Sequence, residues 1–303
     1  MTALFTLFAL AGFAANSILC RVALGPRAID PASFTAVRLA SGAAALGLLA
    51  AVRRTRHRSS HAGSWTSALL LFLYAMPFSF AYVSLGVATG ALILFLSVQA
   101  TMLAGALIGG ERIHWLEALG ILSALTGLVY LIAPGLSAPD PRGAVLMAAA
   151  GAAWGIYTLR GRRSLDAIGD TAANFVRSVP LAIVAGALLW ALASAVGRAA
   201  TPHVSTAGLL LATGSGVLAS GAGYAAWFAA LRSLRALQAA ALQLTVPVIA
   251  AAGGILFLSE RVSMRLMVSA ALILGGVGMA LGGRAARTRV VSRSSGSTRP
   301  LMG

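Results

Sequence analysis

The sequence contains no lysine, so all 23 of its basic residues are arginines. This absence excludes nucleotide hydrolysis at a P-loop, because the lysine of that motif must reach the phosphates of the nucleotide. It also excludes a cofactor held as a Schiff base, because that bond needs a side-chain amine. Cysteine is almost as rare, and the single Cys20 cannot form a disulfide within the chain.

Charged residues as a whole are scarce. They make up 10% of the 303 residues, while hydrophobic residues make up 59% and the mean hydropathy is +0.88. A soluble domain carries about 25% charged residues, and a chain of this size cannot bury so much apolar surface in one aqueous core. We therefore predict an integral membrane protein. The long, uniformly apolar runs favour helices over the short alternating segments of a membrane barrel.

The apolar runs predict ten transmembrane helices in an all-α fold. Each run is about 20 residues long, which is the length that crosses the hydrocarbon core of a bilayer. The expected spans are residues 2–20, 32–52, 65–85, 88–110, 115–132, 143–159, 171–196, 205–231, 236–258 and 264–283.

The arginines are distributed unevenly between the loops. If the N-terminus is cytoplasmic, 15 of them fall in cytoplasmic segments and 6 in external ones. Cytoplasmic loops are the ones enriched in basic residues, so we predict an inner (plasma) membrane protein with both termini in the cytoplasm. The net charge of +16 then reflects topology and contact with anionic lipid, and no nucleic-acid partner is expected.

Two stretches of the sequence resemble each other. Residues 88–113 and 237–262 are both apolar runs that end in a charged pair, and Glu111 matches Glu260 at a shift of 149 residues. Earlier in the two copies, Arg38 matches Arg177 at a shift of 139 residues. Each copy contains five expected spans, and an odd number of spans inverts the second copy in the membrane.

The repeat predicts the domain organisation. We expect two inverted five-helix repeats with a substrate site between them near the middle of the membrane, and transport by alternating access. The repeats would cover residues 1–137 and 138–283, and the arginine- and serine-rich tail 284–303 would be disordered.

These features together resemble the drug/metabolite transporter superfamily, EamA type. The resemblance covers about Leu4 to Gly283 and depends on an ordered set of features: five plus five spans, Ala153-Trp154-Gly155, the two arginines Arg38 and Arg177, and the run from Leu244 to Pro247 that ends at Glu260. The first half departs from the pattern, because Val98 stands where Pro247 stands in the second copy and Ala15 stands where Trp154 does.

The resemblance implies an exporter of amino acids or related small metabolites in the inner membrane. It implies a cavity built mainly from the first, third and fourth spans and their partners in the second copy, with the fifth and tenth spans at the periphery. A small-molecule substrate and membrane lipid are the implied partners. Small residues spaced four apart, such as Gly105 and Gly109, permit close helix packing or a homodimer.

Uncharged polar and aromatic residues inside the spans are the candidates for substrate binding. Such groups can orient a small zwitterion or amide in an apolar cavity, although polar residues also hold membrane helices together. The candidates are Asn16, Tyr82, Gln99, Trp154, Tyr157, Ser220, Tyr224, Trp227, Gln243 and Thr245.

A second set of residues is assigned to structure or gating: Arg38, Arg177, Pro247, Glu111 and Glu260. Each arginine lies only about two turns from a membrane surface, so we favour bonds to helix-end carbonyls over contact with substrate. The glutamates are expected to be salt-bridged anchors at helix ends, and Pro247 to be a hinge or a fixed kink.

Three rival functions follow from the same sequence. Multidrug efflux of the kind seen in small multidrug resistance proteins needs a buried acid, and none of the seven acidic residues is expected near the middle of the membrane. An enzyme is not expected, because the four histidines fall in loops and no HExxH or Gly-x-Ser-x-Gly motif is present. We accordingly expect no metal and no cofactor. The third alternative, a membrane sensor or scaffold that does not transport, is not excluded by the sequence.

Overall fold

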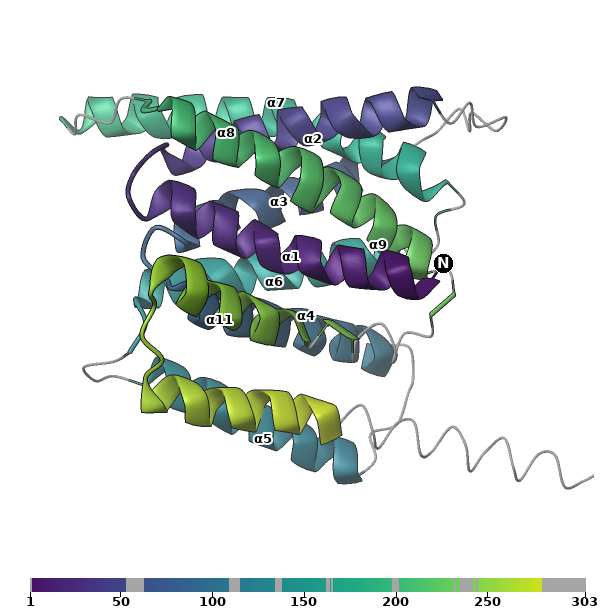
Figure 1. Cartoon of the computed structure of the whole chain (residues 1–303), viewed down its shortest axis with the longest axis vertical. Helices are drawn as coiled ribbons and strands as arrows, with labels where there is room; N and C mark the ends of the chain where they lie inside the picture. The colour runs from purple at the N-terminus through teal and green to yellow at the C-terminus, as the bar shows by residue number, and fades with distance from the viewer. Residues whose placement is uncertain are drawn as a thin grey trace, which may run out of the picture.

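The computed structural model describes residues 2–52, 63–108, 115–133, 138–161, 164, 166–197, 202–231, 233–234, 242–243 and 245–279. These residues are almost entirely helical, and the one β contact among them is an isolated bridge between Ile29 and Val204. The all-α prediction is confirmed. The helices lie side by side in one stack, with the chain crossing it back and forth (Figure 1).

The helices of the first half are α1 (Thr2–Leu24), α2 (Pro31–Val52), α3 (Trp65–Ala81), α4 (Val87–Ile108) and α5 (Trp115–Ile132). The second half contains α6 (Pro141–Gly161), α7 (Ala167–Ala195), α8 (Thr206–Gly214), the π-helical segment η1 (Ser215–Ala222), α9 (Gly223–Leu231) and α11 (Thr245–Leu258). A final helix covers Met264–Met279. Helix α7 begins four residues before the predicted span, so Asp170 lies in its first turn and not in a loop as expected.

Elements α8, η1 and α9 follow one another without a break and form a single rod, Thr206–Leu231. Five described segments, including this rod, are long and apolar enough to cross a bilayer: Thr2–Leu24, Pro31–Val52, Val87–Gly105, Ala167–Ala195 and Thr206–Leu231. Large apolar side chains such as Leu188, Leu192 and Phe257 are exposed on the outside of the bundle. The protein is a multi-pass membrane protein, and the number of ten spans stays a prediction.

The acidic residues that the structure describes lie at helix ends. Asp30, Asp140 and Asp166 accept hydrogen bonds from backbone N–H groups in the first turns of α2, α6 and α7. Side-chain oxygens in this position satisfy donors that have no partner within the helix. The pKa of Asp140 is lowered by the Gly143 N–H and by the Ser84 hydroxyl.

Helices from the two halves pack in pairs. Helix α2 packs on α7, α3 on α6, α4 on α11, and α1 on the rod Thr206–Leu231. The hydroxyl of Ser123 in α5 donates to the carbonyl of Leu272 at 3.0 Å, which joins α5 to the final helix. This last pair lies at one end of the stack (Figure 1) and contacts α4 through Leu92 and Leu96.

Glycines allow the closest of these approaches. A Cβ atom at Gly216 would overlap the Ser41 hydroxyl and the Arg38 carbonyl of α2, and one at Gly151 would overlap the Leu94 carbonyl of α4. Membrane helices use small residues in this way to bring their backbones together. The pairing of η1 with α2 therefore depends on the absence of a side chain at Gly216.

Candidate functional site

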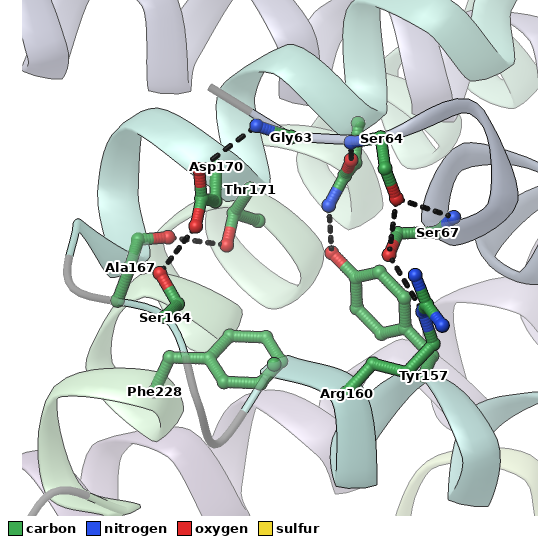
Figure 2. A pocket seen from close by; sticks show the side chains of 12 residues that line it. Gly63, Ser64, Ser67, Tyr157, Arg160, Ser164, Ala167, Asp170, Thr171 and Phe228 are labelled. Atoms are coloured by element: carbon green, nitrogen blue, oxygen red, sulfur yellow. Dashed lines mark hydrogen bonds between the residues drawn. The ribbon is translucent and has the colours of Figure 1, made fainter. Parts of the chain in front are cut away.

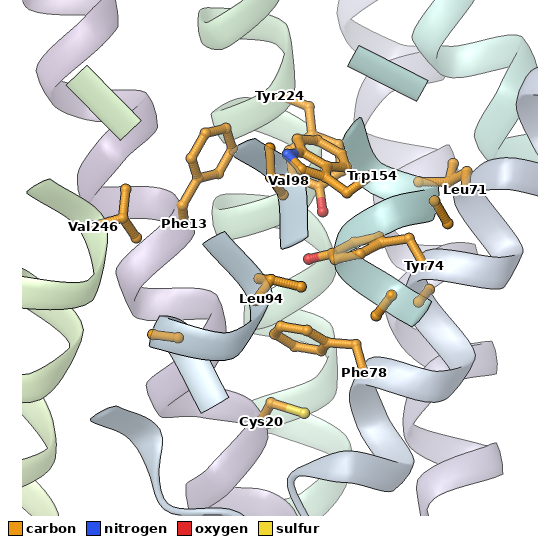
Figure 3. Close-up of a cluster of buried hydrophobic side chains, with 14 of the residues drawn as sticks. Phe13, Cys20, Leu71, Tyr74, Phe78, Leu94, Val98, Trp154, Tyr224 and Val246 are labelled. Atoms are coloured by element: carbon orange, nitrogen blue, oxygen red, sulfur yellow. The ribbon is translucent and has the colours of Figure 1, made fainter. Parts of the chain in front are cut away.

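Aromatic side chains from four elements meet in the middle of the bundle (Figure 3). The rings of Trp154 and Tyr224 are 4.5 Å apart, those of Tyr74 and Trp154 are 5.0 Å apart, and those of Phe13 and Trp227 are 5.5 Å apart. Tilted and edge-to-face arrangements at these distances are favourable for aromatic pairs. We call Phe13, Tyr74, Phe78, Trp154, Tyr224 and Trp227 the aromatic cluster.

Arg38 of α2 inserts its guanidinium group into the aromatic cluster and is only 1% exposed. Its Nε donates to the hydroxyl of Ser220 at 2.9 Å, and its Nη2 donates to the hydroxyls of Tyr74 and Tyr224, each at 3.0 Å. The guanidinium carbon lies 5.1 Å from the ring centroids of both Tyr74 and Phe78, within the range of a cation–π interaction.

The hydrogen-bond partners of Arg38 are not the helix-end carbonyls that were expected. Its partners are hydroxyls from three elements, namely α3, η1 and α9. The carbonyl-binding role belongs instead to Arg21, which donates to the carbonyls of Tyr82 and Val83 at 2.9 and 3.0 Å. Arg177, the repeat partner of Arg38, lies apart from the cluster, because its guanidinium is next to Gly63 before α3.

The π-helical segment η1 supplies two hydroxyls to this region. Ser220 binds Arg38, and Ser215 donates to the Asn16 side-chain oxygen at 2.6 Å. The amide nitrogen of Asn16 then donates to the Tyr74 hydroxyl at 3.1 Å. The wider turn of a π-helix lines up residues five apart, and such segments occur often at functional sites.

Two buried N–H donors at the aromatic cluster have no acceptor among the described residues. Nη1 of Arg38 and Nε1 of Trp227 are buried and have no hydrogen-bond partner among the residues that the structure describes. Among the residues that the structure describes, Arg38 is also the only charged side chain that is buried. Since arginine and tryptophan donate but do not accept, a group that satisfies these two N–H donors must supply acceptors.

Two cavities lie at opposite ends of the antiparallel pair α3 and α6. The first has a volume of about 220 Å³ and is bounded by the start of α3, the end of α6, the start of α7 and the end of α9 (Figure 2). The second has a volume of about 780 Å³ and is bounded by the end of α3, the start of α6 and the segment from Leu24 to Pro31. Tyr74 and Trp154, in the middle of α3 and α6, lie between them.

The first cavity is closed on one side by bonds between α7 and the residues that precede α3. The N–H of Gly63 donates to Asp170 Oδ1 at 2.8 Å, and the N–H of Ser64 donates to Asn174 Oδ1 at 2.9 Å. Figure 2 shows both bonds beside Arg160, whose Nε donates to Ser67 at 3.3 Å. We call the two backbone bonds the α3–α7 latch, because they join the two halves of the chain.

Glu260 forms the corresponding connection at the other end of the bundle. Both of its carboxylate oxygens accept the N–H of Val87 at 2.9 Å, and Oε1 lies 3.9 Å from Nε of Arg21. A carboxylate at the start of α4 is favourable because the helix dipole is positive there. Its cationic partner is thus Arg21 of α1. Glu111 lies outside the described residues.

The remaining candidates divide by position. Asn16, Trp154, Ser220, Tyr224 and Trp227 belong to the central site. The ring of Tyr157 is 5.6 Å from that of Trp154, and the ring of Tyr82 is 4.8 Å from that of Phe78, so both extend the cluster toward its ends. Gln99 and Gln243 are buried, whereas Thr245 is exposed and donates to the Leu242 carbonyl at 2.7 Å. Pro247 is in the first turn of α11, where its missing N–H removes no helical bond.

Sequence reasoning missed Phe13, Tyr74, Phe78 and Ser215. Tyr74 carries a polar tip in the middle of the third expected span, which was the available signal. The phenylalanines and the serine had no comparable signal, because apolar and small residues are common throughout the spans.

The comparisons with known proteins decide the family. The model of the EamA-like transporter family matches residues 1–133 and 141–282. The chain belongs to the EamA-like transporter family. This family is part of the drug/metabolite transporter superfamily, and its members are membrane transporters, not enzymes.

Two individual proteins are similar to this EamA-like chain. A Pseudomonas aeruginosa protein described as "Uncharacterized protein PA1977" is 46% identical over 289 residues, which cover 94% of this chain and 97% of that protein. A solved structure described as "Crystal structure of protein" has a TM-score of 0.61 at 21% identity, with 90% of this chain and 95% of that chain covered. At that identity the second similarity shows the fold alone.

Proposed function

We propose that the protein is a secondary transporter that exports amino acids or related small metabolites across the inner (plasma) membrane by alternating access. The observation that carries this proposal is the presence of two separate cavities at opposite ends of the α3–α6 pair, with the buried aromatic cluster between them. A substrate bound at the cluster could be reached from either end in turn if the two halves rock against each other.

The packing of the helices supports an inverted repeat. Each helix of the first half can be matched with the helix at the same position in the second half. Exchanging the halves in this way turns the pairs α2–α7 and α4–α11 into themselves. The pair formed by α1 and the rod Thr206–Leu231 maps onto the pair of α6 and α3. Together with the sequence shifts of 139 and 149 residues, this supports ten spans in two inverted repeats, residues 1–137 and 138–283.

The arginine bias of the loops supports the orientation. Fifteen arginines against six favour cytoplasmic termini. The first cavity lies at the end of the bundle where α1 begins. The end of α9 borders this cavity, and the rod Thr206–Leu231 runs antiparallel to α1, since Asn16 bonds to Ser215 while the earlier residue Phe13 contacts the later residue Trp227. In this orientation the first cavity faces the cytoplasm and the second faces outward.

Counterflow in proteoliposomes tests the function. The purified protein would be reconstituted and offered a panel of labelled amino acids, other metabolites and cationic dyes, with and without a pH gradient. We expect saturable exchange of an amino acid or a related metabolite. Exchange of dyes alone would replace the proposal with multidrug efflux, and folded protein that exchanges nothing in the panel would favour a sensor or scaffold.

Two substitutions test the candidate transport residues, one at the aromatic cluster and one at a separate buried amide. Tyr224→Ala removes a ring and a hydroxyl from the cluster, and Gln243→Ala removes a buried amide that has no partner among the described residues. We expect each variant to lose exchange by about tenfold or more, equivalent to about 1.4 kcal/mol of transition-state binding, with normal membrane insertion. Tyr130→Ala, at an exposed position on α5, should retain exchange. Unchanged exchange in both test variants would place the site elsewhere.

A further inference from the structure

We propose that Arg38 is the anion anchor of the transport site and that the substrate is a small carboxylate whose uncharged portion sits among the aromatic rings. This inference rests on the proposed transport function, which it makes more specific. It also changes the role of Arg38, which the sequence alone had favoured as a structural residue.

The positive charge of Arg38 has no counter-ion among the described residues. A cation held inside a membrane protein is costly, and such residues line substrate pathways or pair with an opposite charge. The described carboxylates lie at helix ends, and the three partners of Arg38 are neutral hydroxyls. These hydroxyls satisfy some of the N–H groups, but they do not neutralise the charge. A bound carboxylate would do so.

Two donors left unpaired in the described part of the site indicate the chemistry of its ligand. Arg38 Nη1 and Trp227 Nε1 are buried without acceptors among the described residues, and neither side chain can accept. A ligand that complements them must supply acceptors. A carboxylate is the simplest such ligand, because its two oxygens match the planar fork of a guanidinium. A single cation favours this monoanion over a phosphate dianion, for which the described cluster offers no second positive charge.

The surroundings restrict the rest of the substrate. Phe13, Phe78 and Trp154 present apolar surface around the guanidinium and its hydroxyl partners. A solute with a net positive charge and no carboxylate would meet the field of Arg38 in a region where the effective dielectric constant is low and like charges repel strongly. The site therefore fits an apolar or zwitterionic carboxylate and disfavours the cationic dyes of multidrug efflux.

Matched ligand pairs test this inference on the unaltered protein. Alanine, leucine, phenylalanine and 3-phenylpropionate would each be compared with the corresponding amide. The N-acetyl derivatives of the three amino acids and their amides would be included, because the amide of a free amino acid carries a net positive charge that Arg38 would repel on its own account. Binding to the full-length protein in detergent would be measured by titration calorimetry, and competition would be measured in the counterflow assay. We expect at least one carboxylate to bind and exchange, and its amide to be about 30-fold weaker or more, since truncating a buried charged pair costs at least that factor.

Variants locate the effect. Arg38→Gln keeps hydrogen-bond donors but removes the charge, and we expect it to lose the preference for the carboxylate over the amide. Arg261→Gln makes the same chemical change at an exposed loop position and should keep that preference. If Arg38→Gln does not fold, Tyr224→Phe provides a second test, because it removes one hydroxyl from Arg38 and should change the carboxylate preference while keeping the ring.

The outcomes separate the two proposals. Exchange of carboxylates and amides with equal affinity would overturn the anion anchor and leave the transport function intact. Carboxylate binding that depends on Arg38 but is accompanied by no exchange would support the anchor and count against transport. Absence of binding for every carboxylate tested would overturn the anchor, whatever other solute is exchanged.

Discussion

Crosslinking cysteines introduced at Ser64 and Asn174 is expected to stop solute exchange, and reduction is expected to restore it. The Ser64 N–H and the Asn174 side-chain oxygen are 2.9 Å apart in the α3–α7 latch, which joins the two halves beside the first cavity. Alternating access requires this cavity to open by separation of elements from different halves. A covalent bond in the latch should therefore reduce exchange to the background of empty liposomes.

The crosslinking experiment would use a Cys20→Ala background, since Cys20 is the only native thiol. Exchange would be measured by counterflow after oxidation and again after reduction, with the crosslinked fraction determined on a gel. Each single cysteine variant serves as a control and should retain exchange under oxidation. Full exchange by quantitatively crosslinked protein would show that the latch need not open, and would count against this form of alternating access.

A methyl group at Gly216 is expected to destabilise the fold strongly. The added Cβ of Gly216→Ala would overlap both the Ser41 hydroxyl and the Arg38 carbonyl, and part of that contact is rigid backbone. Overpacking of this kind costs about 1–3 kcal/mol. We expect a lower yield of monodisperse protein and a lower midpoint in thermal unfolding. Because Arg38 belongs to the same contact, solute exchange should fall as well.

Gly214 provides a matched control two residues earlier in the same rod. A Cβ at this position meets no atom within 4 Å, so Gly214→Ala tests only the helical preference of the residue. Alanine favours a helix over glycine by about 0.5–1 kcal/mol, and this variant should be as stable as the natural protein or slightly more stable. Equal stability of the two alanine variants would contradict the tight contact between η1 and α2.

Most of the helical framework could be predicted, because the signal is local. Apolar runs about 20 residues long identify membrane helices without reference to their neighbours, and polar residues such as Ser64 and Ser205 mark helix starts. The error at α7 has a local cause too. Asp166 caps the helix, so α7 already includes Asp170, which lies just outside the predicted span of residues 171–196.

The candidate site was less predictable. Arg38 was singled out for its charge, but its distance from the end of its span pointed to helix-end carbonyls. The structure places hydroxyls around it that come from positions as far as 186 residues away in the sequence. Tyr74 was missed although it touches Asn16 and Arg38. Its polar tip in mid-span was a signal, but only the tertiary packing of α3 shows which polar groups that tip meets.

The sequence by itself determined that this is an all-helical membrane protein with arginine as its only strong base, and it predicted that no acid lies near the middle of the membrane. Those properties depend on composition and on the order of apolar and polar residues along the chain. Only the tertiary structure decided which polar groups meet. The pairing of α2 with the rod Thr206–Leu231, which contains the π-helical turn Ser215–Ala222, brings Arg38 to the hydroxyls of Ser220 and Tyr224. The packing of α3 beside α2 adds the hydroxyl of Tyr74. This convergence depends on the crossing angles and registers of the packed helices. Those are set by contacts between side chains that are distant in the sequence.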